Sequence, residues 1–471
     1  MLWALLGFSV VVLALTSAFH AILRTRTAQG AMAWLVALFS MPILAIPLYW
    51  LFGRRHFAGY TQSWRAHMDE LRPLARVAQG NLEAFHVPED ARHPTYTGLQ
   101  ALAHGQVTRG NDIELLIDGE PTFASIVEGI AKATRYVLVE FYIVRDDGLG
   151  RRLRDALVER ARAGVAVSFV YDEQGSSSLS KAYRRSLEEA GVRIVEFGTT
   201  RGWTNRFQVN FRNHRKIVVV DGQVAWIGGH NVGDEYVGLH KKLTPWRDTH
   251  IRLEGPAVLE AQAAFLLDWC WATGELLDLE WEAVASPTGD RQALVVATGP
   301  ADEVETGKLL HAHLANRAQR RLWIATPYFV PEPAVAAALQ LAALRGVDVR
   351  VLVPLHNDSQ LVRFASYWHV QELGGSGIQF LQYPRGFMHQ KVVLVDDDIA
   401  SIGTHNFDNR SFLLNFEVAA LVFDREVAGR VAAMLEHDME HAVPLDPAGL
   451  AARPLWFRLA TRAARLMAPV Q

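Results

Sequence analysis

The chain has 471 residues, of which 50% are apolar and 21% charged, so it can bury a substantial core and is not generally disordered. Its formal net charge of −3 argues against a protein that binds nucleic acid through a global positive field. The single cysteine, Cys270, excludes an intramolecular disulfide and is typical of a reducing compartment.

The N-terminal region is much more apolar than the rest of the chain. Residues 1–23 contain no Lys, Arg, Asp or Glu and are long enough to span a bilayer. A cleaved signal peptide is disfavoured, because there is no basic region before the apolar run. A second apolar stretch occupies residues 31–53, so we predict a membrane hairpin of two helices within residues 1–56. Pro42 and Pro47 leave a kinked or re-entrant second helix as an alternative.

The arginines that flank these stretches bear on orientation. Arg24 and Arg26 lie in the loop between the stretches, whereas Arg54, Arg55 and Arg65 follow the second one. Under the positive-inside rule this distribution favours a cytoplasmic location for the rest of the chain.

The rest of the chain contains two halves with similar sequence patterns. Segments 136–144 and 322–330 are apolar strands, and each is followed by a helical stretch and a second strand, with Gly164 and Gly346 ending the helices. We therefore predict an α/β fold of two duplicated lobes related by a pseudo-twofold axis. The predicted division is a polar connector at 57–108, a first lobe at 109–285, a second lobe at 286–450 and a C-terminal segment at 451–471.

A motif with the spacing H-x-K-x-x-x-x-D occurs once in each half, in FRNHRKIVVVDG and in GFMHQKVVLVDDD. Because side chains alternate on a strand, each His and Lys project to one side and the Asp does not join them. The six residues are His214, Lys216 and Asp221 in the first copy, and His389, Lys391 and Asp396 in the second.

Residues 221–222, Asp-Gly, are a strong signal for a two-residue hairpin turn. Such a turn pairs Val220 with Gln223 and places Gly229 opposite His214. Asn231 then lies just past Gly229 on the return strand. The corresponding residues of the second copy are Gly403, Thr404 and Asn406.

An imidazole, an ammonium and a carboxamide bind a metal poorly, because the ammonium repels a cation and offers no lone pair. The same set suits a phosphate, with a neutral histidine as nucleophile or proton acceptor. Two copies brought face to face allow one histidine to attack phosphorus while the other protonates the leaving oxygen. Asp248 and Glu417 lie downstream of the motifs and are candidates to orient the two histidines.

On these residues the chain resembles the phospholipase D superfamily, whose mark is two such motifs, each followed by a G-[GST]-x-N segment. Within it the chain is similar to the bacterial cardiolipin synthases. The supporting segments are NHRKIVVVDGQVAWIGGHNVGDEY, PWRDTHIRLEGPAV, GFMHQKVVLVDD and GTHNFDNRSFLLNFE, together with the paired apolar stretches at the N-terminus.

The resemblance implies roles for the site residues. His214 would attack the phosphorus of a phosphatidyl donor to give a phosphohistidine, and His389 would protonate the departing alcohol and then deprotonate the acceptor; the family does not strictly fix which histidine does which. Asp221 and Asp396 belong to the catalytic motif, although the strand alternation makes them turn-building residues. The implied phosphate-binding residues are Lys216, Asn231, Lys391 and Asn406, and the histidine-orienting residues are Asp248 and Glu417.

The implied reaction joins two phosphatidylglycerol molecules into cardiolipin and releases glycerol, with no cofactor and no metal, at the bacterial inner (cytoplasmic) membrane. Two alternatives stay open: phosphatidylethanolamine as a co-substrate, and hydrolysis with water as acceptor. A nuclease is disfavoured by the negative net charge. A non-enzymatic scaffold should have lost a motif histidine or lysine, and this chain keeps all of them.

The C-terminal segment is amphipathic if it is helical. One interpretation is an interfacial anchor on anionic lipid; the other is a terminal helix packed on the second lobe with its arginines in solvent. The apolar side would carry Trp456, Leu459, Ala463, Leu466 and Met467, and the basic side Arg458, Arg462 and Arg465.

Overall fold

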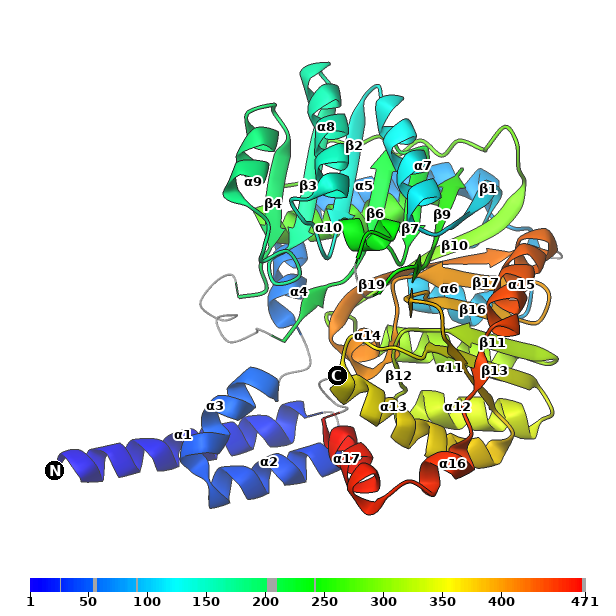
Figure 1. Cartoon of the computed structure of the whole chain (residues 1–471). Coiled ribbons are helices and arrows are strands. Elements are labelled where there is room, and N and C mark those ends of the chain that lie inside the picture. Colours follow the sequence, from blue (N-terminus) through cyan, green and yellow to red (C-terminus); the bar gives the residue numbers. More distant parts are fainter. Residues whose placement is uncertain (26, 54–56, 90–91, 201–209, 241–242, 468–471) are drawn as a thin grey trace.

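The computed structural model describes residues 1–25, 27–53, 57–89, 92–200, 210–240 and 243–467 (Figure 1). Three apolar helices come first, apart from a large α/β body that contains the strands (Figure 1).

The N-terminal helices are α1 (Leu2–Arg24), α2 (Ala28–Ser40) and α3 (Pro42–Phe52). Helix α1 is long and apolar enough to cross a membrane. The second apolar stretch is not one straight helix: it is divided at Met41 into α2 and α3, each too short to cross a bilayer alone. The kinked or re-entrant alternative agrees with this division, and the membrane hairpin stays a prediction. Pro42 explains the division, because proline lacks an N–H and disfavours helical geometry in the residue before it. Of the flanking arginines, Arg26, Arg54 and Arg55 lie outside the described residues.

The strands confirm the duplication. The first set follows the order β1-β9-β7-β6-β2-β3-β4 and the second the order β10-β19-β17-β16-β11-β13-β14, so each strand has a counterpart at the same place. The first set is β1 (Thr108–Ile117), β2 (Tyr136–Phe141), β3 (Ala166–Asp172), β4 (Arg193–Phe197), β6 (Ile217–Val220), β7 (Val224–Gly228) and β9 (Thr249–Glu254). The second is β10 (Arg291–Thr298), β11 (Arg321–Ala325), β13 (Asp348–Pro354), β14 (Gln379–Tyr383), β16 (Val392–Val395), β17 (Ile399–Gly403) and β19 (Asn415–Phe423), with β20 (Val443–Pro444) at its edge.

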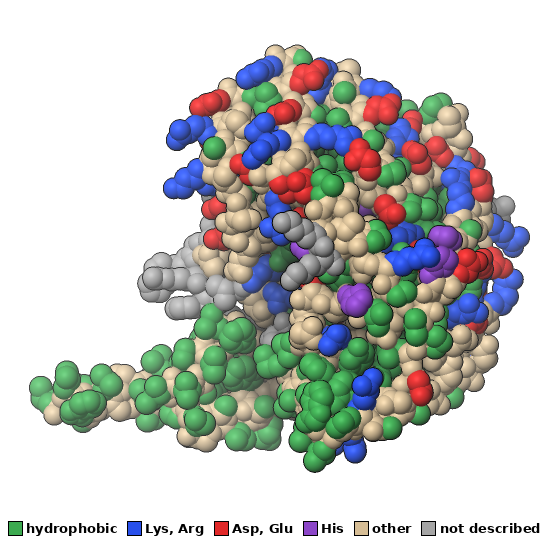
Figure 2. All heavy atoms as spheres, in the orientation of Figure 1, with side chains coloured by type: hydrophobic (Ala, Val, Ile, Leu, Met, Phe, Trp, Pro, Cys, Tyr) green, Lys and Arg blue, Asp and Glu red, His purple; other side chains and the backbone are tan. Residues whose placement is uncertain are grey.

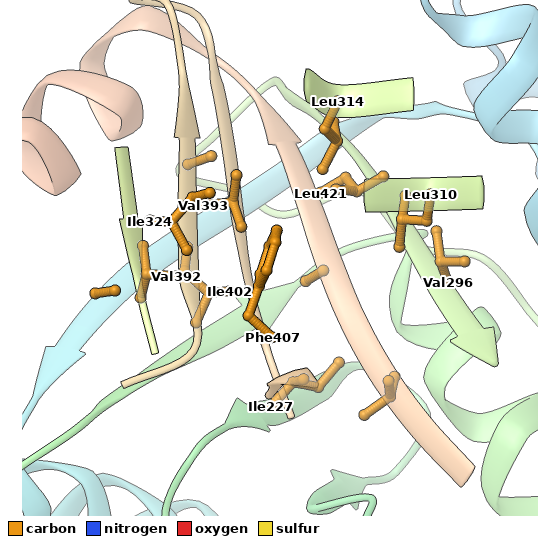
Figure 3. Packing of buried hydrophobic residues seen from close by; sticks show 14 of the residues in the cluster. Ile227, Val296, Leu310, Leu314, Ile324, Val392, Val393, Ile402, Phe407 and Leu421 are labelled. Atoms are coloured by element: carbon orange, nitrogen blue, oxygen red, sulfur yellow. The ribbon is translucent and has the colours of Figure 1, made fainter. Parts of the chain in front are cut away.

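The two sheets join where β1 pairs antiparallel with β10. The main core runs across this junction, and Figure 3 shows part of it, including Ile227 from β7, Val296 from β10 and Leu421 from β19. The helices of the body are α7 (Gly119–Ala131), α8 (Gly148–Arg162), α9 (Lys181–Glu188), α10 (Val258–Thr273), α11 (Thr306–Arg317), α12 (Pro333–Leu344), α13 (Gln360–Leu373), α14 (Asn409–Leu413), α15 (Arg425–Glu440), α16 (Pro447–Ala451) and α17 (Leu455–Leu466).

Residues 57–108, expected as a polar connector, contain α4 (Ala58–Ala66), α5 (Met68–Leu82) and α6 (Tyr96–Ala103). Phe57, Tyr60 and Leu99 from this stretch are buried in the main core. The connector is therefore packed on the lobes, and the exact domain boundaries stay a prediction.

The two motif hairpins have a longer turn than predicted. Val220 pairs with Val224, not with Gln223, and Val395 pairs likewise with Ile399, so each turn contains three residues. Gly229 is consequently one place off the position opposite His214. The first turn residue, Asp221 or Asp396, takes a left-handed conformation with φ of 53° or 51°.

Short strands link the lobes directly. In the first link, β5 (Arg212–Asn213) runs parallel to the start of β19. In the second, β8 (Trp246–Arg247) runs parallel to β15 (Phe387–Met388). A further pair, β12 (Phe329–Val330) with β18 (Phe407–Asp408), lies within the second half. Each motif histidine follows directly after one of the linking strands, so the interface between the lobes positions both.

Candidate active site

His214 lies at the end of β5 and is held by the second lobe. Its backbone N–H donates to the carbonyl of Phe416 at 2.9 Å. Its ring Nδ1 lies 2.8 Å from Oε2 of Glu417, the next residue along β19.

His389 repeats this arrangement with the lobes exchanged. Its backbone N–H donates to the carbonyl of Arg247 at 2.7 Å, and its Nδ1 lies 2.7 Å from Oδ2 of Asp248. Both histidines are buried. Because Nδ1 of each ring is engaged by a carboxylate, Nε2 is the nitrogen left for a substrate. Each orienting carboxylate thus comes from the lobe that does not carry its histidine.

The two lysines are also buried at this site. Nζ of Lys216 donates to the carbonyl of His214 at 2.6 Å and lies 5.4 Å from the centre of the Tyr142 ring. Nζ of Lys391 donates to the carbonyl of His389 in the same way. Burial lowers the pKa of Lys216 to about 7 and that of Lys391 to about 8.

Burial is also the main influence on the histidines. It lowers the pKa of His214 to about 4 and that of His389 to about 3, helped by the positive charges of both lysines and opposed by the partner carboxylates. Lys391 acts on His214 and Lys216 on His389, so the two motifs form one electrostatic unit. Both rings are therefore neutral near pH 7.

The two carboxylates remain ionised. Burial opposes this, but Lys391 and the hydrogen-bonded His389 hold the pKa of Asp248 below its usual range. For Glu417, burial is likewise outweighed by His214 and the nearby basic groups, and the pKa is about 2.

The predicted asparagines are buried beside the motifs. Oδ1 of Asn231 accepts from the backbone N–H of Ile143 at 3.0 Å, and its Nδ2 donates to the Tyr236 hydroxyl at 3.0 Å. Within the described residues, Oδ1 of Asn406 has no hydrogen-bond partner. An amide nitrogen carries two hydrogens, so Nδ2 of Asn231 can still donate one to a substrate oxygen. The unpaired Oδ1 of Asn406 is an acceptor, so a phosphate would be bound by its Nδ2.

Asp221 and Asp396 do not lie with the histidines, so the expectation that they belong to the catalytic set is wrong. The Asp221 carboxylate accepts from the backbone N–H groups of residues 134–136, at the start of β2. The Asp396 carboxylate accepts from the N–H groups of residues 319–321, at the start of β11. Both fix the far end of the motif hairpin, as the strand alternation predicts.

Aromatic rings enclose the site, and these were not predicted as functional residues. The Tyr142 ring lies 4.9 Å from the His214 ring, and the His389 ring has Trp246 at 5.2 Å and Phe387 at 5.7 Å. These residues flank the motif or belong to the repeated strands, but aromatic side chains most often build cores. For Trp246 and Phe387, the pairing of β8 with β15 reveals their place beside His389.

Gly229 also matters for the geometry. A Cβ atom at this position would collide with the carboxylate of Asp248. The glycine therefore leaves the space in which Asp248 reaches His389.

The chain has two lobes of one topology, and each contributes an H-x-K-x-x-x-x-D motif to a shared buried site. These features place it in the class of phospholipase D-like proteins. A family model described as "Cardiolipin synthase, PLD-like domain" matches residues 126–244 and 312–439. A second, described as "Phospholipase_D-nuclease N-terminal", matches residues 12–54.

Curated relatives match nearly the whole chain. Cardiolipin synthase A of Pseudomonas putida is 44% identical over 473 residues, covering 99% of this chain and 98% of that one. Cardiolipin synthase A of Pseudomonas aeruginosa is 44% identical over 478 residues, covering 99% and 96%. The chain therefore belongs to the cardiolipin synthase family of the phospholipase D superfamily.

Solved structures share the fold. The crystal structure of phosphatidylserine synthase from Haemophilus influenzae has a TM-score of 0.62 at 15% identity, covering 80% of this chain and 100% of that chain. Polyphosphate kinase from Porphyromonas gingivalis has a TM-score of 0.50 at 13% identity, covering 76% and 54%. At these identities the likeness concerns the fold alone.

Proposed function

We propose that this chain is a membrane-bound phosphatidyltransferase that forms cardiolipin from two phosphatidylglycerol molecules and releases glycerol. The observation that carries the proposal is the crossed pairing of His214 with Glu417 and of His389 with Asp248, which gives one site two oriented, neutral imidazoles. The curated relatives, both cardiolipin synthases, support the same reaction.

In the first half-reaction, Nε2 of His214 attacks the phosphorus of the donor lipid. An N–P bond forms, the P–O bond to glycerol breaks, and the leaving oxygen takes a proton from Nε2 of His389. In the second, His389 takes the proton from the hydroxyl of a second phosphatidylglycerol, whose oxygen attacks phosphorus as the N–P bond breaks. The phosphodiester bond energy is kept in the phosphohistidine.

The first step requires a protonated His389, although burial and Lys391 favour the neutral ring. The nearby positive charge of Lys391 is one cause of its low pKa, after burial. A bound phosphodiester carries a negative charge that offsets this lysine, so substrate binding favours the imidazolium form. The proposed phosphate-binding residues are Lys216, Lys391, Asn231 and Asn406.

For the setting, we place α1 in the bacterial inner membrane with the catalytic lobes on the cytoplasmic side. The length and apolar character of α1 support insertion, and the arginine distribution and lone cysteine support the orientation. Protease digestion of spheroplasts tests this: the lobes should be cleaved only after the membrane is opened.

A product analysis tests the reaction. Purified chain is incubated with labelled phosphatidylglycerol in mixed micelles containing chelator, beside His214→Ala. Cardiolipin and glycerol from the parent alone support the transferase; phosphatidic acid alone means that water is the acceptor. Adding phosphatidylethanolamine tests the other co-substrate, since cardiolipin formed only in its presence would establish it as a partner. Absence of product in every mixture contradicts an enzymatic function.

A further inference from the structure

The C-terminal helix α17 has two apolar faces, and the body uses one of them. Phe457 packs against Phe364 at 5.6 Å and Tyr367 at 5.8 Å between ring centres, both from α13. Ala464 joins a buried cluster with Val330. Helix α17 is therefore fixed to the second lobe through a stripe different from the apolar side predicted from the sequence.

The predicted apolar side points away from the body. Leu455, Trp456, Leu459 and Leu466 are 67%, 65%, 56% and 78% exposed. With 3.6 residues per turn, these positions and Ala463 gather on one face, roughly opposite Phe457, Thr461 and Ala464. Exposed apolar surface of this extent on a helix already docked by its other face marks a contact surface.

The charges beside this face are positive. Arg453, Arg458 and Arg462 are exposed, and residues 447–467 contain no Asp or Glu. Arg465 instead contacts the second lobe, because its guanidinium lies 3.7 Å from the centre of the Trp368 ring on α13. A net negative chain thus has a locally cationic, apolar helix at its C-terminal end, which complements an anionic apolar boundary such as a lipid headgroup layer.

The position of α17 agrees with this partner. It lies at the same lower end of the molecule as α1, α2 and α3 in the view of Figure 1, and Figure 2 shows hydrophobic side chains gathered over both regions. Helix α1 exposes large apolar residues along its length, including Leu2, Phe8 and Phe19. At 12 residues α17 is too short to cross a bilayer, so a contact with the bilayer would be at its surface.

We propose that the outer face of α17, formed by Leu455, Trp456, Leu459, Ala463 and Leu466, docks on the anionic surface of the membrane that α1 enters. The two alternatives drawn from the sequence then apply to different faces of one helix. The inserted α1 and the surface-bound α17 attach the molecule at two points. Because α17 is packed on α13, this second contact sets how the second lobe faces the lipid.

Site-specific fluorescence tests the contact in the full chain. The native Cys270 is buried, so a thiol-reactive fluorophore reports on Leu459→Cys, with Ala182→Cys on the outer side of α9 as the matched control. The labelled proteins are reconstituted into nanodiscs that contain phosphatidylglycerol and a nitroxide-labelled lipid, and iodide serves as the aqueous quencher.

We expect the nitroxide lipid to quench the label at residue 459 and iodide to quench the label at residue 182. Equal quenching of both sites by iodide overturns the proposal. A label at residue 459 that is shielded from iodide yet untouched by nitroxide also overturns it, since a second copy of the chain then covers the face. These outcomes do not depend on which reaction the enzyme catalyses.

A second variant gives a kinetic readout. Leu459→Glu places a charge on the exposed face without touching the contact with α13, and Ala182→Glu is its control. We expect Leu459→Glu to lower activity on phosphatidylglycerol vesicles by about tenfold or more, because a surface anchor works through its buried apolar area. Activity on short-chain, monomeric phosphatidylglycerol should be unchanged. An equal loss on both substrates, or no loss on vesicles, contradicts the proposal.

Discussion

Nδ1 of His214 lies 2.8 Å from Oε2 of Glu417, although 203 residues separate them in the chain. His389 and Asp248 repeat this contact in the opposite sense at 2.7 Å. Neither lobe therefore contains a complete His–carboxylate pair. The duplication has two roles: it supplies the two histidines, and it lets each lobe orient the histidine of the other.

Glu417→Gln and Asp248→Asn should each lower kcat by about 100-fold or more, because an amide does not hold the imidazole in the required tautomer or stabilise its protonated form. The measurement is cardiolipin formation at saturating lipid. The double variant should lose far less than the product of the two single losses, since the pairs act as a unit. Independent, multiplying losses would contradict the view that the two pairs act as a unit.

Asp396→Ala should reduce stability and leave catalysis nearly intact. The carboxylate is buried and accepts from three backbone N–H groups at the start of β11, so its loss should cost about 2–4 kcal/mol of unfolding free energy. Thermal unfolding measures this, and kcat per folded molecule should stay within about threefold of the parent. A loss of kcat as large as that of Glu417→Gln would return Asp396 to the catalytic set.

The sequence predicted the duplicated fold, because strand periodicity and two copies of one motif are local signals. It also named the histidines, the lysines and both orienting carboxylates. It did not predict which carboxylate serves which histidine, since that depends on how the lobes dock through β5 with β19 and β8 with β15.

The errors have local physical causes. The motif turn gained a residue because Asp221 adopts a left-handed conformation and its carboxylate reaches the backbone of a neighbouring strand. The second apolar stretch broke at Met41 because of the proline that follows it. The outer and inner faces of α17 could not be told apart by pattern, since Phe457 and Trp456 are equally apolar and only α13 distinguishes them.

Gly229→Ala should reduce activity by about tenfold or more, because the new methyl group meets the Asp248 carboxylate and moves it from His389. Gly429→Ala on α15 is the control, since a Cβ atom there meets nothing within 4 Å. The two variants should differ in kcat with similar melting temperatures. If Gly229→Ala keeps full activity, the contact between Asp248 and His389 is not required.

The pH dependence follows from the depressed pKa values. Phosphate binding needs protonated lysines, so kcat/KM should fall as pH rises through about 7 to 8, where Lys216 and Lys391 lose their protons. The buried His214, with a pKa of about 4, stays a neutral nucleophile well below pH 6. Activity should therefore persist on the acid side further than an ordinary histidine would allow.

The free energy of unfolding, unlike the activity, should fall as the pH is lowered below about 6.5. Between roughly pH 6.5 and 4 the unfolded histidine binds a proton that the buried His214 does not, so each unit of falling pH costs up to about 1.4 kcal/mol for this group. His214→Asn removes that titration, so the difference in unfolding free energy between parent and variant should narrow or reverse as pH falls from 6.5 to 4. Denaturant unfolding at several pH values measures it. A constant difference would mean that His214 titrates in the folded protein as it does in the unfolded chain, and that its ring is already charged near pH 6.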